Sequence, residues 1–165
     1  IGPYERGGPV TVTRDAELWR RLGLYLLLFG IAGTATELVL LEHMEDRLQW
    51  TPLVLLALGL LVGGYVAVRP TRAVVTGLRT LMAVYVPVGA LGVYLHVKSN
   101  VEFELEMRPS MAGLELLVES LTGAMPALAP GTMAQLGLLG LLVCFRHPAL
   151  SAPGTDSQEP WTPES

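Results

Sequence analysis

Two histidines and the carboxylates near them are the side chains of this 165-residue chain whose types would support chemistry. His43 and His96 stand at the ends of apolar stretches that we predict to end on the same side of a membrane, so their imidazoles would lie at similar depth. Imidazole nitrogens combined with carboxylate oxygens suit zinc, copper, iron or manganese. The candidate metal ligands are His43, His96, Glu42 and Glu45.

The same two histidines support other interpretations. Two axial imidazoles from different helices would ligate a single haem iron. Histidines at a membrane edge also serve as interfacial side chains that bind no ligand. Because the sequence contains neither an H-x-x-x-H nor a C-x-x-C spacing, it does not choose among a transition metal, a haem and no cofactor.

A further candidate is Glu37, which lies inside an apolar stretch about one helical turn before its end. An ionisable side chain inside a bilayer is costly and by default indicates a functional site. Glu37 would carry a proton in a transporter, ligate a metal, or form half of a buried pair, with Gln135 as its polar partner. The alternative is an acid close enough to the surface for its carboxylate to reach water.

Four apolar stretches position these side chains. Hydrophobic residues make up 51% of the chain and charged residues 16%, against the roughly 25% of charged residues usual in soluble domains. About 20 apolar residues in a helix cross a hydrocarbon layer that is roughly 30 Å thick. We therefore predict an all-α integral membrane protein, a four-transmembrane-helix bundle with spans at residues 22–41, 53–68, 80–97 and 127–145.

Basic residues predict the orientation of these spans. Four spans put both termini on one side, and the basic residues there are Arg6, Arg14, Arg20, Arg21, Arg69, Arg72, Arg79 and Arg146. Those on the other side are Arg47, Lys98 and Arg108. Because basic residues are retained in the cytoplasm, we predict cytoplasmic termini and acidic loops outside, as in many small bacterial inner-membrane proteins. Residues 1–21 would form an N-terminal arm and residues 148–165 a disordered tail.

The predicted outer loop, residues 99–123, begins with an alternation of apolar and acidic residues. This alternation has the period of a half-buried strand. The apolar face of the strand would consist of Val101, Phe103, Leu105 and Met107. Because a strand with unpaired edges needs a partner, we predict that these four residues bind another subunit.

An amphipathic helix is predicted for the second half of this loop, from an N-cap at Ser110 to Thr122. Its apolar face would carry Leu114, Leu117, Val118 and Leu121, which are spaced three or four residues apart. Such a helix either lies flat on the membrane or docks onto a partner protein. Gly123 is expected to end it.

Small residues predict how the spans pack. Helices in a bilayer approach closely where glycines replace larger side chains. Pairs spaced for such contacts are Gly30 with Gly33, Gly59 with Gly63, and Gly137 with Gly140. We expect these pairs to serve packing within the chain rather than dimer formation.

Charge and motifs narrow the function classes. The net charge of −4 argues against the basic face of a nucleic-acid binder. Neither a G-x-S-x-G nucleophile motif nor a glycine-rich phosphate loop occurs in the sequence. We therefore expect a non-enzymatic accessory subunit of a larger membrane complex, with lipid and other protein subunits as partners. The alternatives are a metal- or haem-binding membrane protein and a component of a proton-coupled transporter.

Overall fold

The computed structural model describes residues 9–41, 47–123 and 126–151, and within these ranges the chain is helical, without a strand. The helices are α1 (Pro9–Leu40), α2 (Arg47–Val68), α3 (Arg72–Met107), α4 (Gly113–Thr122) and α5 (Gly131–Cys144), followed by a 3₁₀ turn, Pro148–Leu150. The prediction of an all-α protein is confirmed for these residues. α1 begins inside residues 1–21, so the predicted N-terminal arm is helical from Pro9 onward.

Three of the helices are long and apolar enough to cross a membrane. They are the part of α1 from Arg14 to Leu40, the part of α2 from Trp50 to Val68, and all of α3. This supports the predicted integral membrane protein and its contact with lipid. The 14 residues of α5 rise only about 21 Å, less than the roughly 30 Å of hydrocarbon. Helix length therefore supports three membrane spans. It does not by itself support the fourth predicted span, at residues 127–145.

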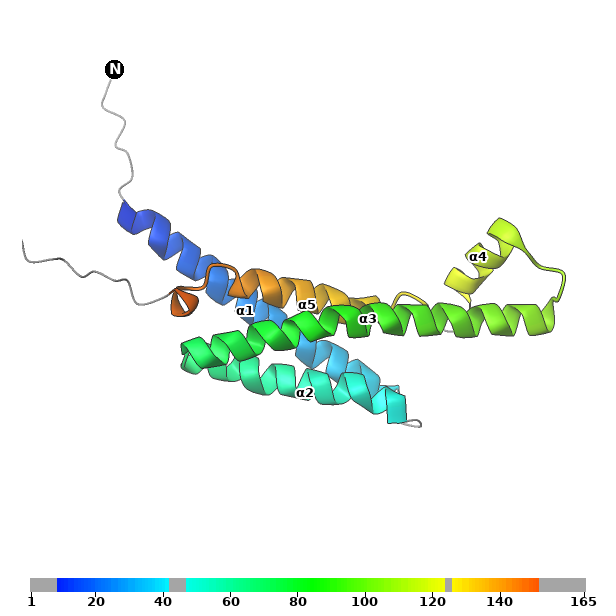
Figure 1. Ribbon diagram of the computed structural model, residues 1–165, viewed down its shortest axis with the longest axis horizontal. Coiled ribbons are helices and arrows are strands. Elements are labelled where there is room, and N and C mark those ends of the chain that lie inside the picture. Colours follow the sequence, from blue (N-terminus) through cyan, green and yellow to red (C-terminus); the bar gives the residue numbers. More distant parts are fainter. Residues whose placement is uncertain (1–8, 42–46, 124–125, 152–165) are drawn as a thin grey trace, which may run out of the picture.

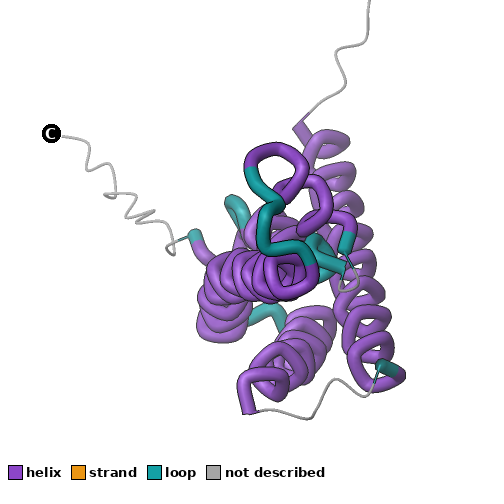
Figure 2. Tube along the Cα trace, turned by 90° about the vertical axis from the view of Figure 1, so that its right-hand side faces the viewer, coloured by secondary structure: helices purple, strands orange, loops and turns teal. Residues whose placement is uncertain are grey.

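The helices pack side by side, with α3 in contact with α2 and α5, and α1 in contact with α2 and α5 (Figures 1 and 2). The most extensive contact joins α3 to α5. Arg20 Nη2 on α1 donates to the carbonyl of Arg146, just after α5, at 3.5 Å. The start of the long apolar stretch of α1 and the end of α5 therefore lie at the same end of the bundle.

Apolar side chains fill the centre of the bundle and also cover its outside. Leu27, Ile31, Leu56, Leu78 and Met82 are fully buried. Large apolar side chains on the outer surface are 78% exposed at Phe29, 71% at Leu61 and 77% at Val68. A helix that is apolar all round is typical of a membrane span, because its outer face contacts lipid instead of water.

Glycines set the closest approaches between helices. A Cβ atom at Gly89 of α3 would collide with the backbone nitrogen of Ala134 on α5. A Cβ atom at Gly137 would lie 2.8 Å from the carbonyl oxygen of Met82. Gly59 of α2 leaves room for the hydroxyl of Tyr85, which donates to the Leu55 carbonyl at 2.7 Å. These contacts join helices of one chain.

The predicted packing role of the glycine pairs is therefore confirmed at five of the six positions. Gly30 and Gly63 approach the side chains of Leu136 and Leu28, and Gly140 approaches Met82. The exception is Gly33, where an added Cβ would meet nothing within 4 Å.

The predicted strand over residues 101–107 is wrong, because α3 continues through them to Met107. Glutamate, leucine and methionine favour helices. Two ion pairs at helical i,i+4 spacing flank the segment, Lys98 with Glu102 at 3.5 Å and Glu104 with Arg108 at 3.0 Å. The sequence alternation therefore does not correspond to two faces of a strand.

The four apolar residues of that segment consequently do not share one face. Residues two apart on a helix point in nearly opposite directions. Val101 and Leu105 are half-buried, whereas Phe103 is 51% and Met107 68% exposed. The predicted four-residue partner-binding face is thus divided between two sides of α3.

Replacing Gly89 by alanine should weaken the packing of α3 on α5. The added methyl meets backbone, which cannot rotate away, so we expect a loss of about 2 kcal/mol of stability from overpacking. The measurement is the thermal unfolding midpoint in mild detergent. Gly77→Ala is the matched control, because a Cβ there meets nothing within 4 Å. It should leave the midpoint unchanged or raise it, and equal losses in both variants would contradict the packing role of Gly89.

Candidate functional site

α3 is longer than a membrane span needs to be. Its 36 residues rise about 54 Å, whereas the hydrocarbon layer is roughly 30 Å thick. Residues 80–97 carry no acidic or basic side chain except His96, and Arg79 and Lys98 flank them. From Lys98 to Met107 the helix continues for about 15 Å. In Figure 1 this end of α3 projects beyond α1, α2 and α5.

α4 folds back along the projecting end of α3, and residues 98–123 together form what we call the α3–α4 hairpin. Asn100 Nδ2 on α3 donates to the carbonyl of Ser120 on α4 at 2.8 Å, and both residues are buried. A Cβ atom at Gly123 would lie 3.3 Å from Asn100 Cγ. The end of α4 is therefore fixed beside the start of the projection.

Arg108 holds the far end of the hairpin. Its guanidinium lies 3.0 Å from Glu104 Oε2 on α3, and 3.6 Å and 3.7 Å from the carboxylates of Glu115 and Glu119 on α4. The hydrogen bond to Glu104, together with the charges of all three acids, raises the pKa of Arg108. One cation thus joins the two helices through three carboxylates.

The connection between α3 and α4 reverses the chain in a few residues. Met111 is buried, and its amide donates to the Arg108 carbonyl at 3.0 Å. Gly113 has a φ of +64°, a conformation that glycine adopts without steric cost. The N-cap is Ala112, which makes no side-chain cap hydrogen bond, so the predicted N-cap at Ser110 is wrong. The predicted end at Gly123 is confirmed.

The amphipathic character predicted for this helix is confirmed, but its orientation is unusual. Ser120 is fully buried toward α3, and Glu119 contacts Arg108. We call the other side the α4 apolar face, and its residues are exposed at Leu114 (75%), Leu117 (51%), Val118 (48%) and Leu121 (39%). Ser120 therefore faces α3, Glu115 and Glu119 reach Arg108 from solvent-accessible positions, and the leucine and valine side chains face the surroundings.

The residues predicted to bind a metal lie mostly outside the described part of the chain. Glu42, His43 and Glu45 are among the residues that the structure does not describe. His96 is half-buried on α3, two residues before Lys98. Over the described ranges, no three His, Cys, Asp or Glu side chains group closely enough to hold a metal ion. The metal and haem interpretations of His43 and His96 stay predictions.

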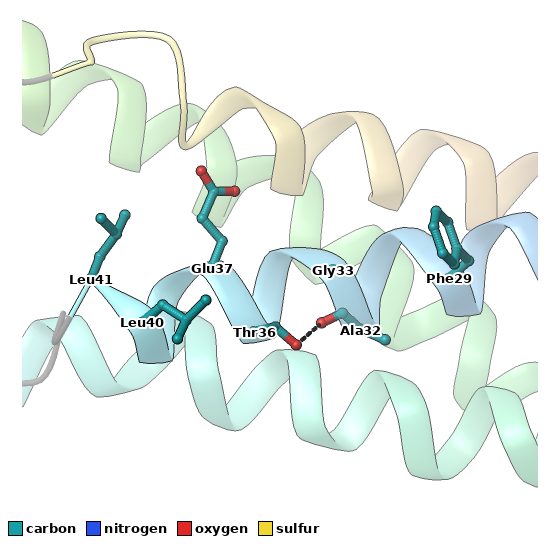
Figure 3. A pocket seen from close by; sticks show the side chains of 7 residues that line it. All are labelled: Phe29, Ala32, Gly33, Thr36, Glu37, Leu40 and Leu41. Carbon is teal, nitrogen blue, oxygen red and sulfur yellow. Dashed lines mark hydrogen bonds between the residues drawn. The ribbon is translucent and has the colours of Figure 1, made fainter.

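Glu37 lies in a shallow groove on the surface of α1. The groove is lined by Phe29, Ala32, Gly33, Thr36, Glu37, Leu40 and Leu41 (Figure 3). Thr36 Oγ1 donates to the Ala32 carbonyl at 2.8 Å, and in Figure 3 the Glu37 side chain extends away from Thr36 and Leu40. Glu37 and Gln135 are both exposed, and no hydrogen bond found between described residues joins them. Their pairing and a proton-carrying role for Glu37 stay predictions.

Sequence reasoning missed the polar contacts that build the hairpin. Arg108 carried a signal, because it is the one basic residue within 99–123 and follows Glu104 at helical spacing. Asn100 and Ser120 carried none, since their hydrogen bond joins residues 20 positions apart and depends on how α4 folds back.

Comparison with protein-family models, curated proteins and solved structures gives no match to this chain.

Replacing Arg108 by glutamine should loosen α4 from α3. The variant loses the two contacts with α4, to Glu115 and Glu119, so amide hydrogen exchange in α4 should become roughly fivefold faster. Hydrogen-exchange mass spectrometry measures this directly. Lys98→Gln is the control, because Lys98 pairs with Glu102 on its own helix. Equal exchange of α4 in the two variants would contradict the role given to Arg108.

Proposed function

We propose that the protein is a non-enzymatic membrane subunit that docks onto a partner protein through the α3–α4 hairpin. One observation carries this proposal: α4 is joined to the α3 side of the hairpin by the Asn100–Ser120 hydrogen bond and the Arg108 ion pairs, and it leaves four apolar side chains exposed. Exposed apolar side chains at i, i+3, i+4 and i+7 form the face with which a helix enters an apolar groove. A projecting helix of this kind is a binding element rather than a catalytic one.

Charge defines the chemistry of the partner. The hairpin carries five glutamates, one lysine and one arginine, a net charge of −3. A complementary partner therefore offers an apolar groove with lysine or arginine at its rim. Phe103 and Met107, the exposed pair among the four residues first predicted to bind a subunit, would extend the contact onto α3.

The same charges favour a protein partner over the membrane surface. Helices that lie on anionic membranes carry lysine and arginine on their polar face. The ionisable residues of α4 are Glu115 and Glu119. Arg108, ten residues beyond Lys98 along the chain, holds Glu115 and Glu119 of α4 to the far end of the projecting part of α3.

We also propose that α5 makes a fourth crossing, which puts the hairpin outside and both termini in the cytoplasm. Successive i→i+3 hydrogen bonds continue α5 backward from Gly131 to Pro126, a stretch that adds about 10 Å. The contact between Arg20 and Arg146 supports the return of the chain to its starting side. The excess of arginine at that end supports its cytoplasmic location.

Purification from native membranes in mild detergent tests the docking function. The protein should elute with a different protein in fixed stoichiometry, measured by light scattering and mass spectrometry. Leu117→Glu combined with Leu121→Glu should reduce recovery of the partner at least about tenfold, because each buried leucine contributes roughly 1.5–3 kcal/mol.

Ser99→Glu combined with Ser110→Glu is the matched control for this experiment. It adds the same two negative charges to exposed positions of the hairpin that are outside the α4 apolar face, so partner recovery should be unchanged. Recovery of the unaltered protein as a free monomer, or equal loss in the control, would contradict the proposed function.

A further inference from the structure

The end of the bundle opposite the hairpin contains a groove between α1 and α5. Ala16, Trp19, Arg20 and Gly23 line it from α1, and Leu139, Leu142, Val143 and Phe145 line it from α5 and its C-cap. Gly23 deepens the groove, because a Cβ atom there would lie 3.1 Å from Val143 Cγ2. The walls are apolar except for the guanidinium of Arg20.

Aromatic side chains place this groove at the edge of the apolar region. Trp19 is 72% and Phe145 66% exposed at its mouth. Tryptophan concentrates where hydrocarbon meets headgroups. The first long apolar stretch of the sequence begins at Leu22, directly after Arg20 and Arg21. The groove therefore runs from the headgroup level into the hydrocarbon.

Arg20 lines the groove, and Arg146 follows the lining residue Phe145 at its polar end. Arg20 Nη2 lies 3.5 Å from the Arg146 carbonyl oxygen, and the Arg146 guanidinium carbon lies 5.6 Å from the centre of the Phe145 ring. Within the described ranges, neither arginine forms an ion pair with a carboxylate, whereas neighbouring Arg21 pairs with Glu17. Their positive charges are therefore available to an anion.

His147 adds no charge to this cluster near neutral pH. It is buried beside Arg20, and its Nδ1 accepts a hydrogen bond from the amide of Ala149 at 3.1 Å. Burial first, and the charge of Arg20 second, lower the pKa of His147. The positive charge at the mouth is therefore that of the two arginines.

We propose that this groove binds an anionic phospholipid, with its phosphate held by Arg20 and Arg146 and one acyl chain along the apolar wall between α1 and α5. Arginine donates to phosphate in a planar fork, and basic sites between membrane helices bind anionic headgroups. Free phosphate would leave the apolar wall unused, and a zwitterionic lipid would leave the two charges uncompensated. This inference is independent of the docking function of the hairpin.

Fluorescence of Trp19 tests the proposal in the full-length chain. Trp50→Phe and Trp161→Phe leave Trp19 as the only tryptophan. The protein is reconstituted in phosphatidylcholine vesicles that contain increasing fractions of brominated phosphatidylglycerol or, separately, brominated phosphatidylcholine. Brominated phosphatidylglycerol should quench Trp19 at a roughly tenfold lower mole fraction. Millimolar inorganic phosphate should leave this quenching unchanged.

Variants connect the preference to the two arginines. Arg20→Gln combined with Arg146→Gln should reduce the tenfold difference to within about twofold, whereas Arg20→Lys with Arg146→Lys should retain most of it. Arg21→Gln is the matched control and should retain it fully, because the Arg21 charge is already paired with Glu17. Circular dichroism shows whether each variant is folded.

Three results would overturn the proposal. They are equal quenching by the two brominated lipids, full preference in the folded glutamine double variant, and displacement of phosphatidylglycerol by inorganic phosphate. The last result would indicate a site for free phosphate instead of a lipid.

Discussion

Lipid offers backbone amides and carbonyls no hydrogen-bonding partners, so a chain that crosses it must satisfy them within helices. α3 does so over 36 residues and is about 54 Å long. A hydrocarbon layer of roughly 30 Å surrounds only part of this length. The remaining turns reach water, where Asn100 and Arg108 provide polar contacts on which α4 packs. The hairpin and its exposed apolar face therefore follow from the excess length of one helix.

Within the apolar part, packing depends on the absence of side chains rather than on burial from water. Gly89 and Gly137 allow α3 and α5 to approach at backbone distance, and Gly59 of α2 leaves room for the Tyr85 hydroxyl to reach the Leu55 carbonyl. This packing separates two chemically different ends. One end is the acidic hairpin with the α4 apolar face, and the other is an apolar groove with arginines at its mouth. The proposed ligands differ accordingly: the hairpin would bind a protein groove with a basic rim, and the groove would bind an anionic lipid.

Hydropathy predicted the helical class, and three of the four predicted spans fall in helices that are long and apolar enough to cross a membrane, because lipid imposes one secondary structure on any long apolar segment. The prediction of a strand at residues 101–107 was wrong. The residues there alternate between apolar and acidic, but Glu104 and Arg108 also have the i,i+4 spacing of an ion pair on a helix. Contacts such as Asn100 with Ser120, or Arg20 with Arg146, depend on tertiary placement and left no local signal. The predicted fourth span coincides with α5, whose 14 helical residues follow a series of turns, so helix length alone does not establish a crossing there.

The sidedness of the hairpin tests the central claim most directly. In a Cys144→Ala background, Ser110→Cys marks the hairpin and Ser151→Cys marks the chain after α5, both at exposed positions. A membrane-impermeant maleimide is applied to sealed vesicles of known orientation. The account predicts that positions 110 and 151 are labelled from opposite sides of the membrane. Labelling of both from the same side would contradict it.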